Sequence, residues 1–77
     1  MAEYIATFFS HYGATAFARE LRNRGIASRT MPVPRHLSSS CGSCVAFSAE
    51  EPLAFLTPEV EAVYARDGAR VWHADEA

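Results

Sequence analysis

Two cysteines, Cys41 and Cys44, lie three positions apart in a segment rich in proline and serine. The segment reads Pro-Val-Pro-Arg-His-Leu-Ser-Ser-Ser-Cys-Gly-Ser-Cys over positions 32–44. Proline fixes φ, and serine and glycine favour turns, so this composition predicts a surface loop. A thiol in such a loop can be reached by a reactant, and sulfur chemistry requires that access. The two cysteines close too short a loop to stabilise a fold by a disulfide.

Cys41 is the predicted nucleophile of this loop. Its neighbours Ser40 and Gly42 leave it unobstructed, and Arg35 and His36 can supply positive charge nearby. Such an environment favours the thiolate, which can accept sulfane sulfur and pass it on.

Cys44 has two interpretations, since it begins an apolar stretch. It is either a resolving thiol, which would attack a persulfide held on Cys41, form a disulfide with Cys41 and release sulfide, or a buried cysteine that acts as a small hydrophobic residue.

A metal site is the alternative chemistry for the same residues. The C-x-x-C spacing is typical of zinc or iron ligands, and His11 and His36 could complete a tetrahedral set with Cys41 and Cys44. A single C-x-x-C without a second pair is a weak signal. We therefore expect no cofactor, and these four residues are the ligands if a metal is bound.

The segments around the cysteines predict the elements that position them. Strands are expected over 4–9, 26–33, 44–48 and 69–73, where β-branched and aromatic residues gather. A first helix begins after Ser10, a typical N-cap, and ends at Gly25. A short helical turn is expected near 52–56. Thr57-Pro58-Glu59 has the residue types of a helix start and predicts a second helix over about 58–66.

This order predicts an α+β domain with the ferredoxin-like split β-α-β arrangement (β-α-β-β-α-β). In that arrangement two helices cover one face of a four-stranded antiparallel sheet. We expect one domain over 1–77, containing the cysteine-bearing loop 32–44 and a flexible tail at 75–77.

The predicted topology also places the loop. A right-handed crossover brings it to the sheet edge where the first helix begins. Cys41 and Cys44 should therefore lie at the same end as Ser10, His11, Tyr12 and Gly13. The free amides of a helix start would stabilise a sulfur anion there, and His11 or Tyr12 could orient it.

Charge is distributed unevenly along a chain whose net charge is −2. Arginines dominate up to Phe47, and acids dominate from Glu50 onward, so the basic half suits an acidic partner surface or an anionic ligand. The acidic pI of about 5.8 and the absence of lysine argue against nucleic-acid binding. The chain has no apolar run of membrane-spanning length and no signal-peptide pattern at its start, so we expect no membrane partner and a cytoplasmic location.

Three stretches resemble the selenium/sulfur carrier-like family of small bacterial proteins: ATFFSH at 6–11, RGI at 24–26, and PVPR through SSSCG at 32–42. The resemblance covers roughly residues 4–47. It implies that Cys41, the cysteine before glycine, is the carrier residue. Cys44 departs from the family pattern, which does not require a second cysteine.

The resemblance implies a small sulfur or selenium carrier that holds a persulfide on Cys41 and relays it between donor and acceptor proteins. It would act as a carrier more than as an enzyme, because the loop offers no evident pocket for a small substrate. An accessory domain that docks on a redox or sulfur-enzyme complex is the first alternative, and a C-x-x-C metal-binding module is the second. Exposed strand edges would permit a homodimer.

Overall fold

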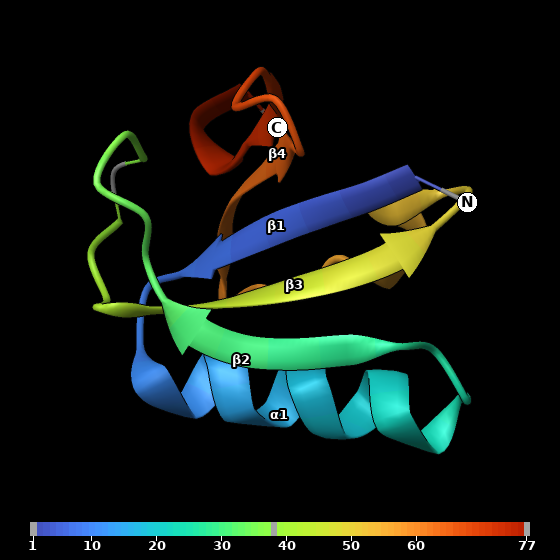
Figure 1. The fold of residues 1–77 in the computed structure, drawn as a ribbon. Helices are drawn as coiled ribbons and strands as arrows, with labels where there is room; N and C mark the ends of the chain where they lie inside the picture. Colours follow the sequence, from blue (N-terminus) through green and yellow to red (C-terminus); the bar gives the residue numbers. More distant parts are fainter. Residues whose placement is uncertain (1, 38, 77) are drawn as a thin grey trace.

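In the computed structural model, which describes residues 2–37 and 39–76, five strands form one antiparallel sheet and α1 covers one of its faces (Figure 1). The elements in chain order are β1 (Ala2–Phe8), α1 (His11–Asn23), β2 (Ser28–Pro32), β3 (Ser43–Ala49), the 3-10 turn η1 (Pro52–Phe55), β4 (Val60–Ala65), β5 (Arg70–His73) and the 3-10 turn η2 (Ala74–Glu76). The strand order in the sheet is β2-β3-β1-β4-β5. The predicted α+β class is confirmed.

The prediction of four strands and two helices is wrong in the second half of the chain. The residues expected to form a helix over 58–66 form strand β4, so the described residues contain five strands and one α-helix. The helix-start signal makes only a single turn, in which Thr57 accepts hydrogen bonds from the amides of Glu59 (to Oγ1, 3.3 Å) and Val60 (to the carbonyl, 3.0 Å). Beyond it, Val60 and Val63 are buried against β1, and this tertiary pairing overrides the local signal.

The other predicted elements are present with shifted ends. The turn expected near 52–56 is η1, and the strand expected over 69–73 is β5. The predicted tail at 75–77 begins within η2, and Ala77 lies outside the described residues.

The connection from β1 through α1 to β2 brings the ends of β1 and β2 to the same edge of the sheet. β3 lies between these two strands and is antiparallel to both, so β1 and β2 are parallel to each other. The segment between β2 and β3 therefore turns back where β1 ends and α1 begins, as Figure 1 shows. Thr7, near the end of β1, lies opposite Cys44. The predicted position of the cysteine-bearing segment is confirmed.

Local signals set both ends of α1. The Ser10 hydroxyl accepts a hydrogen bond from the amide of Gly13 at 3.2 Å and caps the N-terminus. At the other end, Gly25 has a φ of 74°, a backbone conformation that residues with a side chain rarely adopt. The amide of Ile26 then donates to the carbonyl of Leu21 at 2.9 Å, and this bond closes a Schellman motif.

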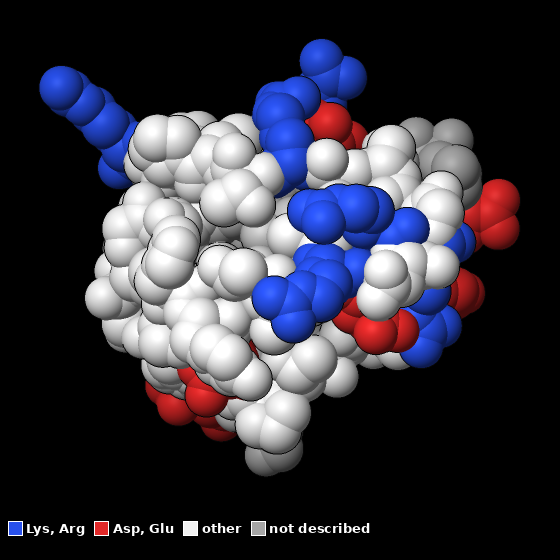
Figure 2. All heavy atoms as spheres, turned by 90° about the horizontal axis from the view of Figure 1, so that it is seen from below, with Lys and Arg blue, Asp and Glu red and all other residues white. Residues whose placement is uncertain are grey.

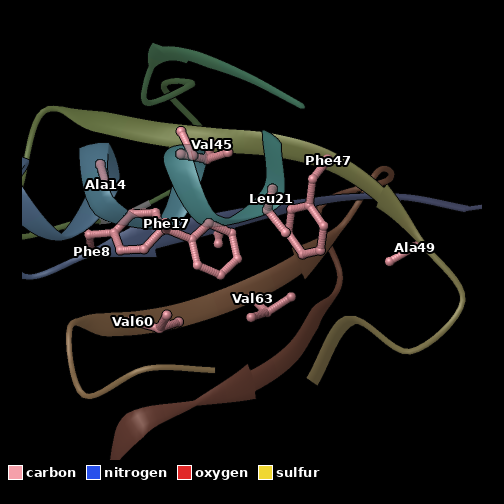
Figure 3. Close-up of a cluster of buried hydrophobic side chains, with 11 residues drawn as sticks. Phe8, Ala14, Phe17, Leu21, Val45, Phe47, Ala49, Val60 and Val63 are labelled. Carbon is pink, nitrogen blue, oxygen red and sulfur yellow. The ribbon is translucent and has the colours of Figure 1, made fainter. Parts of the chain in front are cut away.

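The core lies between α1 and the sheet (Figure 3). Its centre is three aromatic rings, in which Phe17 of α1 packs against Phe8 of β1 and Phe47 of β3 with ring centroids 5.1 and 5.4 Å apart. Each of these side chains is almost fully buried, and burying one stabilises the fold by about 1.5–3 kcal/mol. This packing fixes β1, α1 and β3, the elements around the cysteines.

Candidate functional site: the cysteine loop

The segment 33–42, which we name the cysteine loop, connects β2 to β3 on the side of the sheet away from α1 (Figure 1). The amide of Val33 donates to the carbonyl of Gly42 at 3.1 Å, so the two ends of the loop stay paired. Within it, the amide of Leu37 donates to the carbonyl of Pro34 at 3.0 Å, and the Leu37 side chain is buried. The loop is therefore anchored by an apolar residue as well as by its ends.

Two serines attach the loop to the sheet immediately before Cys41. The Ser39 hydroxyl donates to the carbonyl of Phe8 at 3.3 Å and accepts from the amide of Cys41 at 3.2 Å. Ser40 donates twice to the Glu61 carboxylate, from its amide at 2.9 Å and from its hydroxyl at 2.8 Å. Ser39 and Ser40 thus attach the chain just before Cys41 to β1 and β4.

The two cysteines are both free thiols but lie in different environments. Cys41 is half-buried in the loop, whereas Cys44 on β3 is completely buried. The Cys44 Sγ donates a weak hydrogen bond to the carbonyl of Pro32 at 3.7 Å. Burial raises the pKa of Cys44, and the negative charge of an ionised Cys41 nearby raises this pKa further. Cys41 is therefore the more exposed cysteine of the pair.

The start of α1 lies at the same end of the molecule, and a protein carboxylate is bound to its cap. The Ser10 hydroxyl, which caps the helix, donates to Oε1 of Glu59 at 2.7 Å. Glu59 therefore lies beside the helix start at which the sequence suggested a sulfur anion. His11 and Tyr12 are exposed in the first turn, Tyr12 to 76%.

The predicted supporting cations lie on the surface. Arg35 and His36 are both exposed. The His36 ring lies beside Gly68 in the β4–β5 turn. A Cβ built on Gly68 would be only 3.3 Å from the Cδ2 atom of His36. In the described part of the chain, no three His, Cys, Asp or Glu side chains gather as metal ligands, so Cys41, Cys44, His36 and His11 do not form the four-ligand set considered above.

Arginine side chains gather over one part of the face that α1 presents (Figure 2). Arg19 and Arg22 of α1 are exposed, and so is Arg24, the residue that caps the helix C-terminus. Arg24 pairs with Glu20 at 2.7 Å and lies over the ring of Phe55 at 5.4 Å. The basic first half of the sequence thus contributes a basic area beside the core helix.

Glu61 is a site residue that the sequence analysis missed. The sequence pattern places it among the acidic residues in the first turn of the expected helix over 58–66. Only the pairing of β4 with β1 brings it to the loop, and no local pattern in the sequence signals that pairing.

Comparison with protein families identifies the class to which this fold and site belong. A family model described as "Putative Se/S carrier protein-like" matches residues 3–61, which include the whole cysteine loop and end at Glu61. The chain belongs to this family, as its cysteine segment suggested. Neither the curated proteins nor the solved structures contain a match to the chain. None of the helices in the described residues has the length and apolar character needed to cross a membrane.

Proposed function

We propose that the chain is a carrier of sulfane sulfur, or of selenium in the same oxidation state, which it holds on Cys41 as a persulfide or its selenium analogue. Membership of the carrier-like family supports this proposal. The observation that carries it is the contrast between the two thiols, since Cys41 is half-buried on a tethered loop and Cys44 is completely buried.

Loading would proceed by thiol exchange. The Cys41 thiolate attacks the outer sulfur of a donor persulfide R–S–SH, and the donor S–S bond breaks as the new one forms. The products are Cys41–S–SH and the donor thiolate R–S⁻, so no external oxidant or reductant is needed. Delivery is the same step in reverse, in which an acceptor thiolate takes the outer sulfur and leaves the Cys41 thiolate.

The burial of Cys44 suits a carrier that must retain its load. A resolving Cys44 thiolate would attack the inner sulfur of the Cys41 persulfide, forming a disulfide and releasing HS⁻. Its raised pKa lowers further the thiolate fraction that a cysteine has at neutral pH, and its complete burial limits its access to reactants. We therefore assign Cys44 a packing role and propose that a partner protein discharges Cys41.

Membership of a carrier-like family favours protein partners for Cys41. A groove of about 410 Å³ lies beside α1, and its lining comes from α1, η1 and the segment before β4, without any residue of the cysteine loop. Sulfur donor and acceptor proteins are thus the proposed partners, in a reducing compartment such as the cytoplasm, where thiols stay free.

Intact-mass measurement tests the proposal. Purified chain is incubated with polysulfide, or with a cysteine desulfurase and cysteine, and its mass is compared with that of the untreated chain. The carrier is expected to gain the mass of one sulfur atom, and Cys41→Ser should abolish this gain while Cys44→Ala keeps it. A gain that depends on Cys44 instead, or no gain from either source, would reject Cys41 as the carrier. Zinc or iron that copurifies with the chain and is lost in Cys41→Ser would favour the metal-binding alternative.

A further inference from the structure

The cysteine loop is attached to the sheet at an irregularity in the pairing of β1 with β4. Phe8 pairs with Val60, but the next residue back, Thr7, pairs with Ala62. Glu61 is therefore the extra residue of a β-bulge on β4. A bulge bends its strand and redirects a side chain, and bulges are common beside functional sites. Here the bulged residue is the one whose carboxylate reaches the loop.

The loop is tied to both strands of this bulge. Glu61, from β4, accepts from the amide and the hydroxyl of Ser40, one donor to each carboxylate oxygen. Phe8, from β1, accepts from the Ser39 hydroxyl through its carbonyl. The Ser40–Glu61 pair supplies two of these three hydrogen bonds, both exposed, and the Ser39–Phe8 bond is partly buried. Both act within two residues of Cys41.

We propose that Glu61 is the positioning residue of the carrier loop and that it holds Cys41 in place through Ser40. Its importance for sulfur transfer rests on the proposed function, whereas its effect on the loop does not. A loop held in one conformation presents a persulfide to a docked acceptor without first having to be ordered, and this lowers the entropic cost of the transfer complex.

Glutamine and alanine at position 61 separate positioning from charge. A glutamine amide can accept from the Ser40 amide and donate to the Ser40 hydroxyl, so Glu61→Gln keeps both hydrogen bonds without the negative charge. Glu61→Ala removes both bonds.

Glu59 provides a matched control two residues away. Its carboxylate also accepts from a serine hydroxyl, but that serine is Ser10 at the start of α1. Glu59→Ala should therefore disturb the helix cap and leave the loop unchanged, although it removes the same chemical group from the same segment.

The experiment measures amide hydrogen exchange in the cysteine loop and the rate at which iodoacetamide alkylates Cys41. In Glu61→Ala, exchange at the Ser40 amide should rise about tenfold, as expected for the loss of a hydrogen bond to a charged acceptor. Alkylation should rise severalfold, because a freed loop exposes Cys41, which is half-buried in the folded chain. Glu61→Gln should stay within about threefold of wild type and Glu59→Ala should match wild type in the loop.

Ser40→Ala serves as a second variant should Glu61→Ala fold poorly. It removes only the hydroxyl bond, so a smaller rise in loop exchange, about threefold, is expected. Two results would overturn positioning by Glu61. One is that Glu61→Ala and Ser40→Ala show the same loop exchange and Cys41 alkylation rates as wild type. The other is that Glu59→Ala changes the loop as much as Glu61→Ala does. Equal behaviour of the glutamine and alanine variants would overturn the hydrogen-bonded mechanism, since the charge alone would then be responsible.

The two proposals fail in distinguishable ways. If wild-type Cys41 takes up no sulfur, the carrier function is rejected, while exchange and alkylation still report whether Glu61 holds the loop. If Cys41 takes up sulfur and Glu61→Ala leaves the loop unchanged, the carrier function stands and the positioning role is rejected.

Discussion

The Cys44 thiol donates to the carbonyl oxygen of Pro32 across the end of the β2–β3 pair, with 3.7 Å between sulfur and oxygen. Cys44 lies beside Thr7 in the sheet, and both residues are completely buried. In this buried environment the protonated thiol is the favoured form of Cys44. A thiolate would lose its hydration and would have no proton to donate to the Pro32 carbonyl.

Stability should therefore fall at alkaline pH through Cys44. The raised pKa means that, above the ordinary value of 9.0, an unfolded chain loses the Cys44 proton while the folded chain keeps it. The unfolded state then binds fewer protons, so the free energy of unfolding decreases as pH rises from about 9 toward the folded pKa. Below that range this contribution is fully present.

Urea unfolding of wild type and Cys44→Ala at about pH 7.5 and about pH 10 measures this effect. Other titrating groups are shared by the two proteins, so the difference between their free energies of unfolding isolates Cys44. Wild type should lose more stability than the alanine variant between the two pH values. A difference that stays constant with pH would contradict this assignment.

A Cys41 persulfide should be stable in the folded chain and discharge on unfolding. Folding keeps Cys44 buried and protonated, whereas unfolding lets it attack the inner sulfur and release sulfide. Sulfide release from loaded wild type and loaded Cys44→Ala is compared with and without urea. The two should release sulfide at equal rates when folded, and wild type should release it faster when unfolded. Faster release from folded wild type would instead support Cys44 as a resolving thiol.

The sequence was most informative where structure depends on neighbours along the chain. The Ser10 cap and the Gly25 end of α1 were predicted because both are local hydrogen-bonding motifs. The position of the cysteine loop followed from the handedness of one crossover, which also requires no tertiary detail.

The β4 strand and its bulge could not be predicted in the same way. Thr57-Pro58-Glu59 does form the turn that its residue types favour, but the next residues pair with β1, more than 50 positions earlier. The contact between Glu61 and Ser40 depends on that pairing, and so does the contact between Glu59 and Ser10. Glu61 at the loop and Glu59 at the helix cap were for this reason absent from the predicted site residues.

Gly13→Ala should destabilise the fold although alanine favours helices. A Cβ on Gly13 would lie 2.5 Å from the Cβ of Glu59, so the chain before β4 would have to move. This overpacking should exceed the gain of about 1 kcal/mol in helix propensity and lower the free energy of unfolding by about 1–2 kcal/mol.

Gly42→Ala is the control for this substitution. A Cβ on Gly42 would meet no atom within 4 Å, so its effect should be within about 0.5 kcal/mol. Thermal or urea unfolding of both variants makes the comparison. If Gly13→Ala and Gly42→Ala had equal free energies of unfolding, the segment around Glu59 would be able to move away from α1 without loss of stability.

Ser10→Ala should lower the free energy of unfolding by about 1–2 kcal/mol. The Ser10 hydroxyl accepts from the amide of Gly13 and donates to Glu59, so its removal leaves a helix amide without its cap and a carboxylate without its donor. Thr15→Ala is the matched control, because it also removes a hydroxyl from the α1 region. That hydroxyl donates to the His11 carbonyl inside the helix, and alanine there is neutral or stabilising. Urea unfolding gives the free energy of unfolding of both variants. The midpoints can be compared directly if the dependence of this free energy on urea concentration is the same for both. If the two alanine variants were equally stable, Ser10 would not be the residue that joins α1 to the carboxylate segment before β4.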